Sequence, residues 1–276
     1  MNVFLTVVRK LMSEARATLV VNLASMFLLG WLNTYFTARV FHRVRKEFGE
    51  GGGGRMLRQL GGDDMSFSTA SLEVAFWIHP FLWVPVVTWA IGRASLAVAG
   101  EVERGTLDMV LTRPISRTSY LLAQVTAGLV GLALIVGFLI AGNQVALFYN
   151  RVEDPPGVRT LFWPALNLMM LGVAVMGLTL GASALDRVRW RSLLFGSFVT
   201  VGGYVAWFLS TRPEMEGSPW TWWMERVALF SLFNPVDAVG AGKDLAFNLE
   251  MLAAVGGAGL VVAFAVFPFR DLPANS

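Results

Sequence analysis

Two ionisable side chains, Glu73 and His79, lie in or beside a strongly apolar stretch and could carry chemistry at a membrane. A carboxyl and an imidazole at this spacing could relay protons, and the imidazole could also ligate a metal. We expect Glu73 at the water-accessible outer end of a span, and His79 deeper, beside Pro80. The alternative is a helix–helix hydrogen bond or a filler for a proline kink. With two His and no Cys in the chain, a metal site is disfavoured.

Amide side chains form a second polar set within apolar stretches: Asn22, Asn33, Asn143, Gln144 and Asn167. Amides in membrane helices commonly hydrogen-bond a neighbouring helix. In a transporter they can instead line the transport pathway, for which the candidates are His79, Asn143, Gln144 and Asn167. No apolar stretch carries an evident Ser–His pair, Asp pair or H-E-x-x-H motif of an intramembrane protease, so an enzyme is disfavoured.

The glycine-rich residues 48–64, "FGEGGGGRMLRQLGGDD", do not form a nucleotide-binding loop. A P-loop needs the pattern G-x-x-x-x-G-K-S/T, and no Lys follows these glycines at the required place. The pair Gly242–Lys243 is followed by Asp244 and also fails the pattern. We therefore expect no cofactor on this chain, and we interpret residues 48–64 as a flexible linker.

Hydropathy predicts the elements that must hold these residues. The 276 residues are 55% hydrophobic and 15% charged, with a mean hydropathy of +0.58, whereas soluble domains are about 25% charged. A net charge of +3 spread along the chain argues against nucleic-acid binding. A span takes about 20 mostly apolar residues. Six stretches qualify: 18–38, 74–98, 119–148, 161–184, 192–210 and 247–268.

The predicted fold class is an all-α membrane protein with one transmembrane domain over residues 1–276. Residues 1–16 form an amphipathic helix expected to lie in the membrane plane, because its apolar residues share one face. The alternative is a plain extension of the first span. Pro80 and Pro85 predict a kink in the second span. The apolar face of the first helix comprises Val3, Phe4, Val7, Val8 and Leu11.

Six spans place both termini on one side of the membrane. Basic residues divide equally between the two sides. When the mixed-charge loop 39–73 is left out of the count, the side that carries the termini has more basic residues than the other side. This excess favours cytoplasmic termini. Residues 39–73 and 211–246 are then extracytoplasmic loops, and residues 101–117 are cytoplasmic.

The stretch from Gly100 to Gln124, "GEVERGTLDMVLTRPISRTSYLLAQ", interrupts the apolar sequence. Gly105 and Thr106 are expected to end the helix that leaves the second span, and Thr106 can cap a new one. Pro114 ends that short helix, and Ser116 caps the third span.

The predicted short helix has one apolar face, formed by Leu107, Val110 and Leu111 at helical spacing. Asp108 lies in its first turn, where the helix dipole favours a negative charge. The alternative is an amphipathic connector that rests on lipid. The basic turn "DRVRWR" between the fourth and fifth spans is either a cytoplasmic anchor or a second contact with a partner, through Arg187, Arg189 and Arg191.

The stretch "EVERGTLDMVLTRPISRTSYLLAQ" resembles the signature of ABC-2-type transporter permeases. "FNPVDAV", residues 233–239, is similar to the Asn-Pro segment before the last span in that family, and the glycine-rich loop after the first span is longer than in minimal members. The matching signature positions are Glu101, Glu103, Gly105, Thr106, Leu107, Asp108, Leu111, Pro114, Ser116 and Arg117.

The resemblance implies a non-catalytic permease subunit of an exporter in a prokaryotic inner membrane. It also implies two copies of a cytoplasmic ATPase that holds ATP and Mg²⁺, and a second permease chain that is identical or related. Residues 106–113 would be the coupling helix, with docking side chains Leu107, Val110 and Leu111. Charges that set its register would be Glu101, Glu103, Arg104 and Arg113.

Two other classes stay open from the sequence. One is an ABC-2-like scaffold whose ATPase drives membrane remodelling or assembly rather than solute passage. The other is a stand-alone channel or enzyme with Glu73 and His79 as its polar centre.

Overall fold

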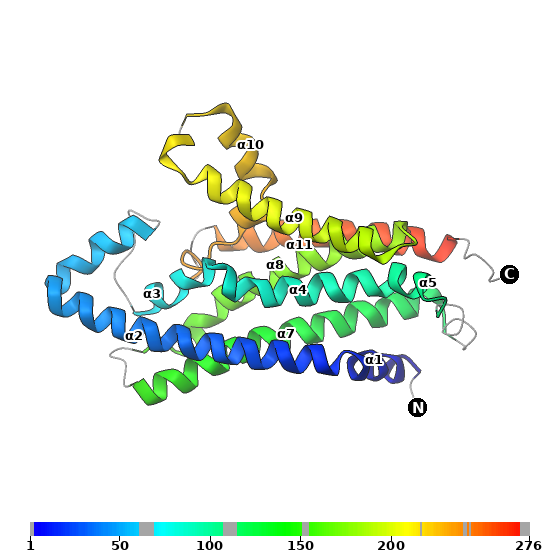
Figure 1. The fold of residues 1–276 in the computed structure, drawn as a ribbon, viewed down its shortest axis with the longest axis horizontal. Coiled ribbons are helices and arrows are strands. Elements are labelled where there is room, and N and C mark those ends of the chain that lie inside the picture. Colours follow the sequence, from blue (N-terminus) through cyan, green and yellow to red (C-terminus); the bar gives the residue numbers. More distant parts are fainter. Residues whose placement is uncertain are drawn as a thin grey trace.

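The computed structural model describes residues 3–60, 69–106, 115–150, 155–215, 217–239, 242 and 244–270. Every regular element in these ranges is helical, which confirms the all-α class. Figure 1 shows the long helices lying along one common axis, with both termini at the same end of the bundle. That placement agrees with an even number of membrane crossings.

Six helical segments within the described ranges are long and apolar enough to cross a membrane, as predicted. The third is the longest, at 34 residues, or about 51 Å at 1.5 Å per residue. The segments are Arg16–Arg39 of α2 (Arg16–Leu60), Pro80–Glu103 through α4 (Pro80–Ser95), η2 (Leu96–Gly100) and α5 (Glu101–Glu103), α7 (Arg117–Asn150), α8 (Val158–Leu185), α9 (Arg189–Ser210), and Leu245–Phe269 through α11 (Leu245–Val266) and η5 (Phe267–Phe269).

Helices α4 and α8 form the centre of the bundle. In the spans Pro80–Glu103 and α8, 67% of the residues in the most apolar stretch are buried, against 17% in α9 at the periphery. Helix α8 meets α11 through glycines, whose small size lets membrane helices approach closely. A Cβ atom on Gly177 would lie 2.1 Å from the carbonyl oxygen of Gly256, so the two backbones touch.

An aromatic cluster joins α4 and α9 to η4 (Leu229–Leu232). The ring of Trp83 lies 4.7 Å from that of Phe230 and 5.0 Å from that of Tyr204. Edge-to-face contacts at this range contribute about 1 kcal/mol beyond the burial of area. The segment before the last span is thereby held against the bundle.

The amphipathic N-terminal helix is α1 (Val3–Glu14), and it ends before Ala15. Its apolar face packs against Ala123 and Ala127 of α7, and Leu11 is buried in this contact. The partly buried side chains around Leu11 are Phe4, Val7, Val8 and Met12. Val3, which the sequence places on this face, is exposed. The helix and its apolar face are confirmed; its position in the membrane plane stays a prediction.

The interpretation of residues 48–64 as a flexible linker is wrong for residues 48–60. Helix α2 continues past the span, through the four consecutive glycines, to Leu60. Each Gly costs about 1 kcal/mol relative to Ala, so local propensity opposes this helix. Helix growth is cooperative, however, because each added residue gains a hydrogen bond on an existing helix. Residues 61–64 lie outside the described residues.

The predicted second span, 74–98, begins later than expected. Residues before it form α3 (Thr69–Ala75) and the short 3-10 helix η1 (Phe76–Ile78). The chain is extended at His79, with φ −67° and ψ 136°, and α4 starts at Pro80. Proline disfavours helical backbone at the residue before it and suits the first helical position. The break therefore lies at His79, and α4 runs on through Pro85.

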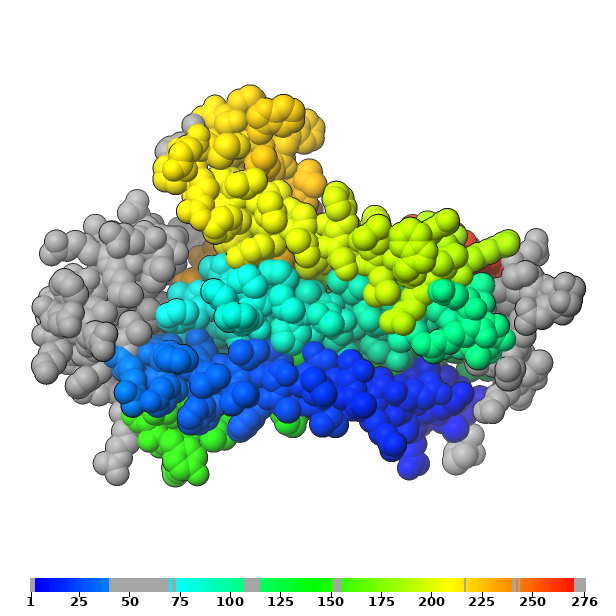
Figure 2. All heavy atoms as spheres, in the orientation of Figure 1, coloured from blue at the N-terminus to red at the C-terminus, as the bar shows by residue number. Residues whose placement is uncertain are grey.

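Residues 211–246, expected as a loop, contain helical elements. These are η3 (Pro213–Met215), α10 (Pro219–Val227) and η4. Figures 1 and 2 show α10 standing out from the bundle beyond the end of α9. Trp220, Trp222 and Trp223 on α10 are exposed.

Candidate functional site

The second span ends in a helix-terminating motif with two specific hydrogen bonds. The N–H of Gly105 donates to the carbonyl of Val102 at 3.1 Å, and the N–H of Thr106 donates to that of Glu101 at 3.1 Å. Gly105 has φ +66°. These two hydrogen bonds, together with a residue in the left-handed backbone conformation, form the Schellman motif. Glycine suits that position because it has no Cβ atom to clash with the backbone. The predicted helix end at Gly105 is confirmed.

The hydroxyl of Thr106 has a different partner from the one expected. It donates to the side-chain Oε2 of Glu101, so it closes the end of the preceding helix. The expected new helix, residues 106–113, begins at Thr106, and its remaining residues lie in the segment 107–114, outside the described residues. The proposed docking side chains Leu107, Asp108, Val110, Leu111, Arg113 and Pro114 are in that segment, and their role stays a prediction.

Ser116 caps the third span, as predicted. Its Oγ accepts the backbone N–H of Ser119 at 3.1 Å, and α7 begins at Arg117. An N-cap hydroxyl that satisfies this N–H contributes about 1 kcal/mol. The segment 107–114 is thus flanked by a defined helix end and a defined helix start.

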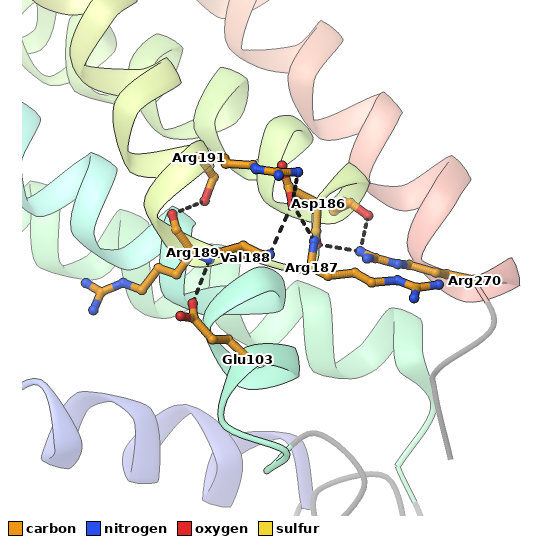
Figure 3. A network of polar contacts seen from close by, with 9 residues as sticks. Glu103, Asp186, Arg187, Val188, Arg189, Arg191 and Arg270 are labelled. Atoms are coloured by element: carbon orange, nitrogen blue, oxygen red, sulfur yellow. Dashed lines mark hydrogen bonds and ion pairs between the residues drawn. The ribbon is translucent and has the colours of Figure 1, made fainter. Parts of the chain in front are cut away.

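Glu103 contacts the turn between α8 and α9 (Figure 3). Its Oε2 accepts the backbone N–H of Arg189 at 2.7 Å, across 86 residues of sequence. Arg189 is the first residue of α9, whose free N–H groups and dipole favour a carboxylate. The signature carboxylate therefore joins the second span to the fifth. A role in docking an ATPase stays a prediction for Glu101, Glu103 and Arg104.

The basic turn is ordered by Asp186. Its Oδ1 accepts the N–H groups of Arg187 and Val188, at 2.7 and 3.1 Å. The guanidinium of Arg191 lies 3.7 Å from the same oxygen. The side chains of Arg187 and Arg191 are exposed, whereas that of Arg189 is half-buried and turns toward Ser95 of α4. A contact of this turn with a partner stays a prediction.

Arg117, the last signature residue, binds the C-terminal segment. Its Nη1 donates to the carbonyls of Pro268 and Arg270, at 3.2 and 2.7 Å. Arg270 in turn donates to the carbonyls of Ala184 and Asp186, each at 2.8 Å (Figure 3). The start of the third span is thus joined through the C-terminal segment to the α8–α9 turn.

The π-helical segment η2, within the second span, is stabilised by polar side chains from neighbouring helices. The hydroxyl of Tyr120 donates to the carbonyl of Ala97 at 3.2 Å. The hydroxyl of Ser183 donates to the carbonyl of Ser95 and accepts the N–H of Ala99. π-Helical turns are frequent at functional sites. Nothing in the sequence indicated this π-helical segment, because the side chains that hydrogen-bond to it come from α7 and α8.

Glu73 is completely buried, which corrects the expected water-accessible position. Its Oε1 accepts the amide of Asn33 and the hydroxyl of Thr34, each at 2.7 Å. These partners lie on the first span and exclude water from the carboxyl. Burial raises the pKa of Glu73, which lies in α3 before the second span, from 4.5 to about 7.

His79 is exposed and lies at the start of α4, not deep within a span. It caps the helix, since its Nδ1 accepts the N–H of Phe81 at 3.4 Å. No group of three or more His, Asp or Glu placed to hold a metal exists among the described residues. The deep position expected for His79 is thus wrong, and its pathway role stays a prediction.

The other amides have separate surroundings. Asn143 is fully buried against α2, close enough that a Cβ atom on Gly30 would lie 2.7 Å from the Oδ1 of Asn143. Neither Oδ1 nor Nδ2 of Asn143 has a hydrogen-bond partner among the described residues. Gln144 donates to the carbonyl of Pro156 at 3.2 Å. Asn22 donates to Thr18 of its own helix. Roles of Asn143 and Gln144 in a pathway stay predictions.

Asn167 holds the Asn-Pro segment in place. Its Nδ2 donates to the carbonyl of Leu232 at 3.0 Å, and its Oδ1 accepts the N–H of Asn234 at 3.1 Å. The buried amide thereby satisfies two backbone groups of the segment before the last span. This arrangement matches the expected role of amides as contacts between elements, and it ties the two sequence features together.

Six helices long and apolar enough to cross a membrane, with a second-to-third connection flanked by a Schellman motif and an N-cap, are the architecture of a polytopic membrane protein. The chain belongs to the ABC-2 family of transporter proteins, whose family model matches residues 12–239. It is similar to the probable ABC transporter permease protein NosY of Stutzerimonas stutzeri, with 29% identity over 242 residues, covering 77% of this chain and 83% of the relative. No solved structure matches the chain significantly.

Proposed function

We propose that this chain couples ATP hydrolysis by a separate cassette ATPase to export of a substrate across the prokaryotic inner membrane. ATP and Mg²⁺ would be held by the ATPase, and residues 106–113 would dock into it. The observation that carries this proposal is the bond from Glu103 to Arg189, which attaches the border of the docking segment to another span.

The contacts around this segment suit the transmission of force. Residues 107–114 connect directly to the second span at Thr106 and to the third span near Arg117. A push on this segment would move both spans. Glu103 would pass the displacement to α9, and Arg117 would pass it to the C-terminal segment. Packed helices move as rigid bodies, because closely packed interiors deform little.

The proposed assembly contains two ATPase subunits and two permease chains, identical or related. Both termini and residues 101–117 would face the cytoplasm, with residues 39–73 and 211–246 on the opposite side. Support comes from the excess of basic residues on the terminal side once the 39–73 loop is set aside, and from the common end of the bundle that the termini and α5 share (Figure 1).

Co-expression with a cassette ATPase tests the docking step. Leu107→Asp and Leu111→Asp should insert in the membrane but recover no ATPase in a pull-down, because a charge replaces an apolar docking side chain. Met109→Asp is the matched control, since Met109 falls off the predicted apolar face and should keep the partner. Normal recovery with both leucine variants would refute docking through this face.

A reconstituted complex tests the export step. Candidate substrates should stimulate ATP hydrolysis and accumulate on the far side of the vesicle membrane. If hydrolysis drives no solute passage but alters an attached protein or the membrane, the remodelling scaffold replaces export as the function.

A further inference from the structure

A cavity of about 250 Å³ is lined by residues near the helix ends that flank the connection between the second and third spans, among them Glu101 and Arg104. Its lining residues come from α1, the start of α2, α4, η2, α5, α7 and α9. Leu11, Ala15 and Leu96 form its apolar part. Pockets for drug-sized ligands measure roughly 300–1,000 Å³. The cavity therefore suits a smaller chemical group.

Arg93 reaches this cavity from within the apolar second span. Its Nη2 donates to Oε1 of Gln124 at 2.9 Å, and Nε2 of Gln124 donates to the hydroxyl of Tyr120 at 2.6 Å. That hydroxyl donates to the carbonyl of Ala97. The Nε of Arg93 is buried and has no partner among the described residues. A fixed guanidinium thus retains an unused donor.

The charges around the cavity are unbalanced. Two carboxylates line it, but Glu14 pairs with Lys10 at 3.4 Å, and Glu101 accepts the hydroxyl of Thr106. Within the described part of the chain, no carboxylate forms an ion pair with the guanidinium groups that line it. These groups come from three elements: Arg93 of α4, Arg104 after α5, and Arg189 of α9.

We propose that this cavity binds the phosphate of an anionic phospholipid headgroup. The planar guanidinium group donates two parallel hydrogen bonds to phosphate oxygens, and an anion between Arg104 and Arg189 would relieve the repulsion between these two cations. The proposal is independent of the coupling to an ATPase.

The lipid origin of the phosphate follows from the position of the cavity. One of its walls is α1, an amphipathic helix at the end of the first span, and the cavity also borders the apolar side chains of Leu11 and Leu96. Basic pockets between membrane helices near the cytoplasmic surface, where the proposed topology places this cavity, suit anionic headgroups. A soluble anion would gain nothing from these apolar walls, whereas acyl chains and a glycerol backbone would.

The test uses the full chain in phosphatidylcholine nanodiscs, titrated with phosphatidylglycerol. Thermal unfolding and native mass spectrometry report the lipid that is bound. Arg93→Gln should weaken the apparent affinity about tenfold, as expected when a charge-assisted hydrogen bond is lost. Because Arg93 is half-buried and its variant could misfold, the double variant Arg104→Gln/Arg189→Gln provides a second measurement. Arg9→Gln, on the exposed face of α1, controls for general attraction to an anionic surface.

Retention of phosphatidylglycerol by wild type and Arg9→Gln, with loss in the cavity variants, would support the site. Equal retention by all variants would overturn it. Inorganic phosphate added to pure phosphatidylcholine nanodiscs forms a separate arm. If it stabilises wild type as strongly as phosphatidylglycerol does, the lipid assignment is overturned in favour of a soluble anion.

Discussion

The carboxylate of Glu103 accepts the backbone N–H of Arg189 at 2.7 Å, so a signature residue of the second span holds the first turn of the fifth. The bond is charge-assisted and lies at a helix N-terminus. Its partner is a backbone group, which any residue at position 189 other than proline would offer. The contact therefore depends on the acid and on the fold rather than on the arginine side chain.

Glu103→Ala should lower the unfolding temperature by about 2 to 4 °C, because an exposed bond of this kind contributes about 1 kcal/mol. Glu103→Gln should retain most of this stability, since its amide oxygen can accept the same N–H. Scanning fluorimetry in detergent measures both. If Glu103→Ala unfolds at the same temperature as wild type, the contact is contradicted.

Gly177→Ala should destabilise the contact between α8 and α11. The new Cβ atom would lie 2.1 Å from the carbonyl oxygen of Gly256, so the helix backbones must separate. Overpacking of this kind costs about 1–3 kcal/mol. Gly257→Ala is the matched control, because a Cβ there meets nothing within 4 Å. The unfolding temperature of Gly177→Ala should lie below that of wild type, and that of Gly257→Ala should lie at or above it. The reverse order would disprove the packing.

Glu73 should make stability depend on pH. Burial raises its pKa to about 7 from 4.5, so the folded chain binds more protons than the unfolded chain between these values. The free energy of unfolding should then fall by about 3 kcal/mol as the pH rises through this window, with full stability below it. Glu73→Gln should remove this dependence. Unfolding temperatures at about pH 5 and about pH 8 test it; equal pH dependence in both proteins would exclude Glu73 as the source.

Asn167→Ala should destabilise the Asn-Pro segment by about 2 kcal/mol, because the carbonyl of Leu232 and the N–H of Asn234 both lose their partner. Gln144→Ala removes a single half-buried bond and should cost less. Denaturant titration in detergent compares the two. If Asn167→Ala keeps wild-type stability yet alters transport, Asn167 is a pathway residue and its anchoring role is minor.

The spans and the caps at Gly105 and Ser116 were predicted from sequence. Each depends on local pattern: the length of an apolar stretch, or a residue type at a helix end. The signature around Glu103 identified the family for the same reason, because its residues are consecutive.

The sequence by itself thus determined the class, the order of the helices and the place of the connection between the second and third spans. Only the tertiary structure decided the partners of Glu103 and Arg117, the burial of Glu73, the surface position of His79 and the cavity around Arg93. These features join residues distant in sequence, 86 positions apart for Glu103 and Arg189. Periodicity and propensity describe neighbours along the chain, whereas burial and hydrogen bonding depend on which helices pack together.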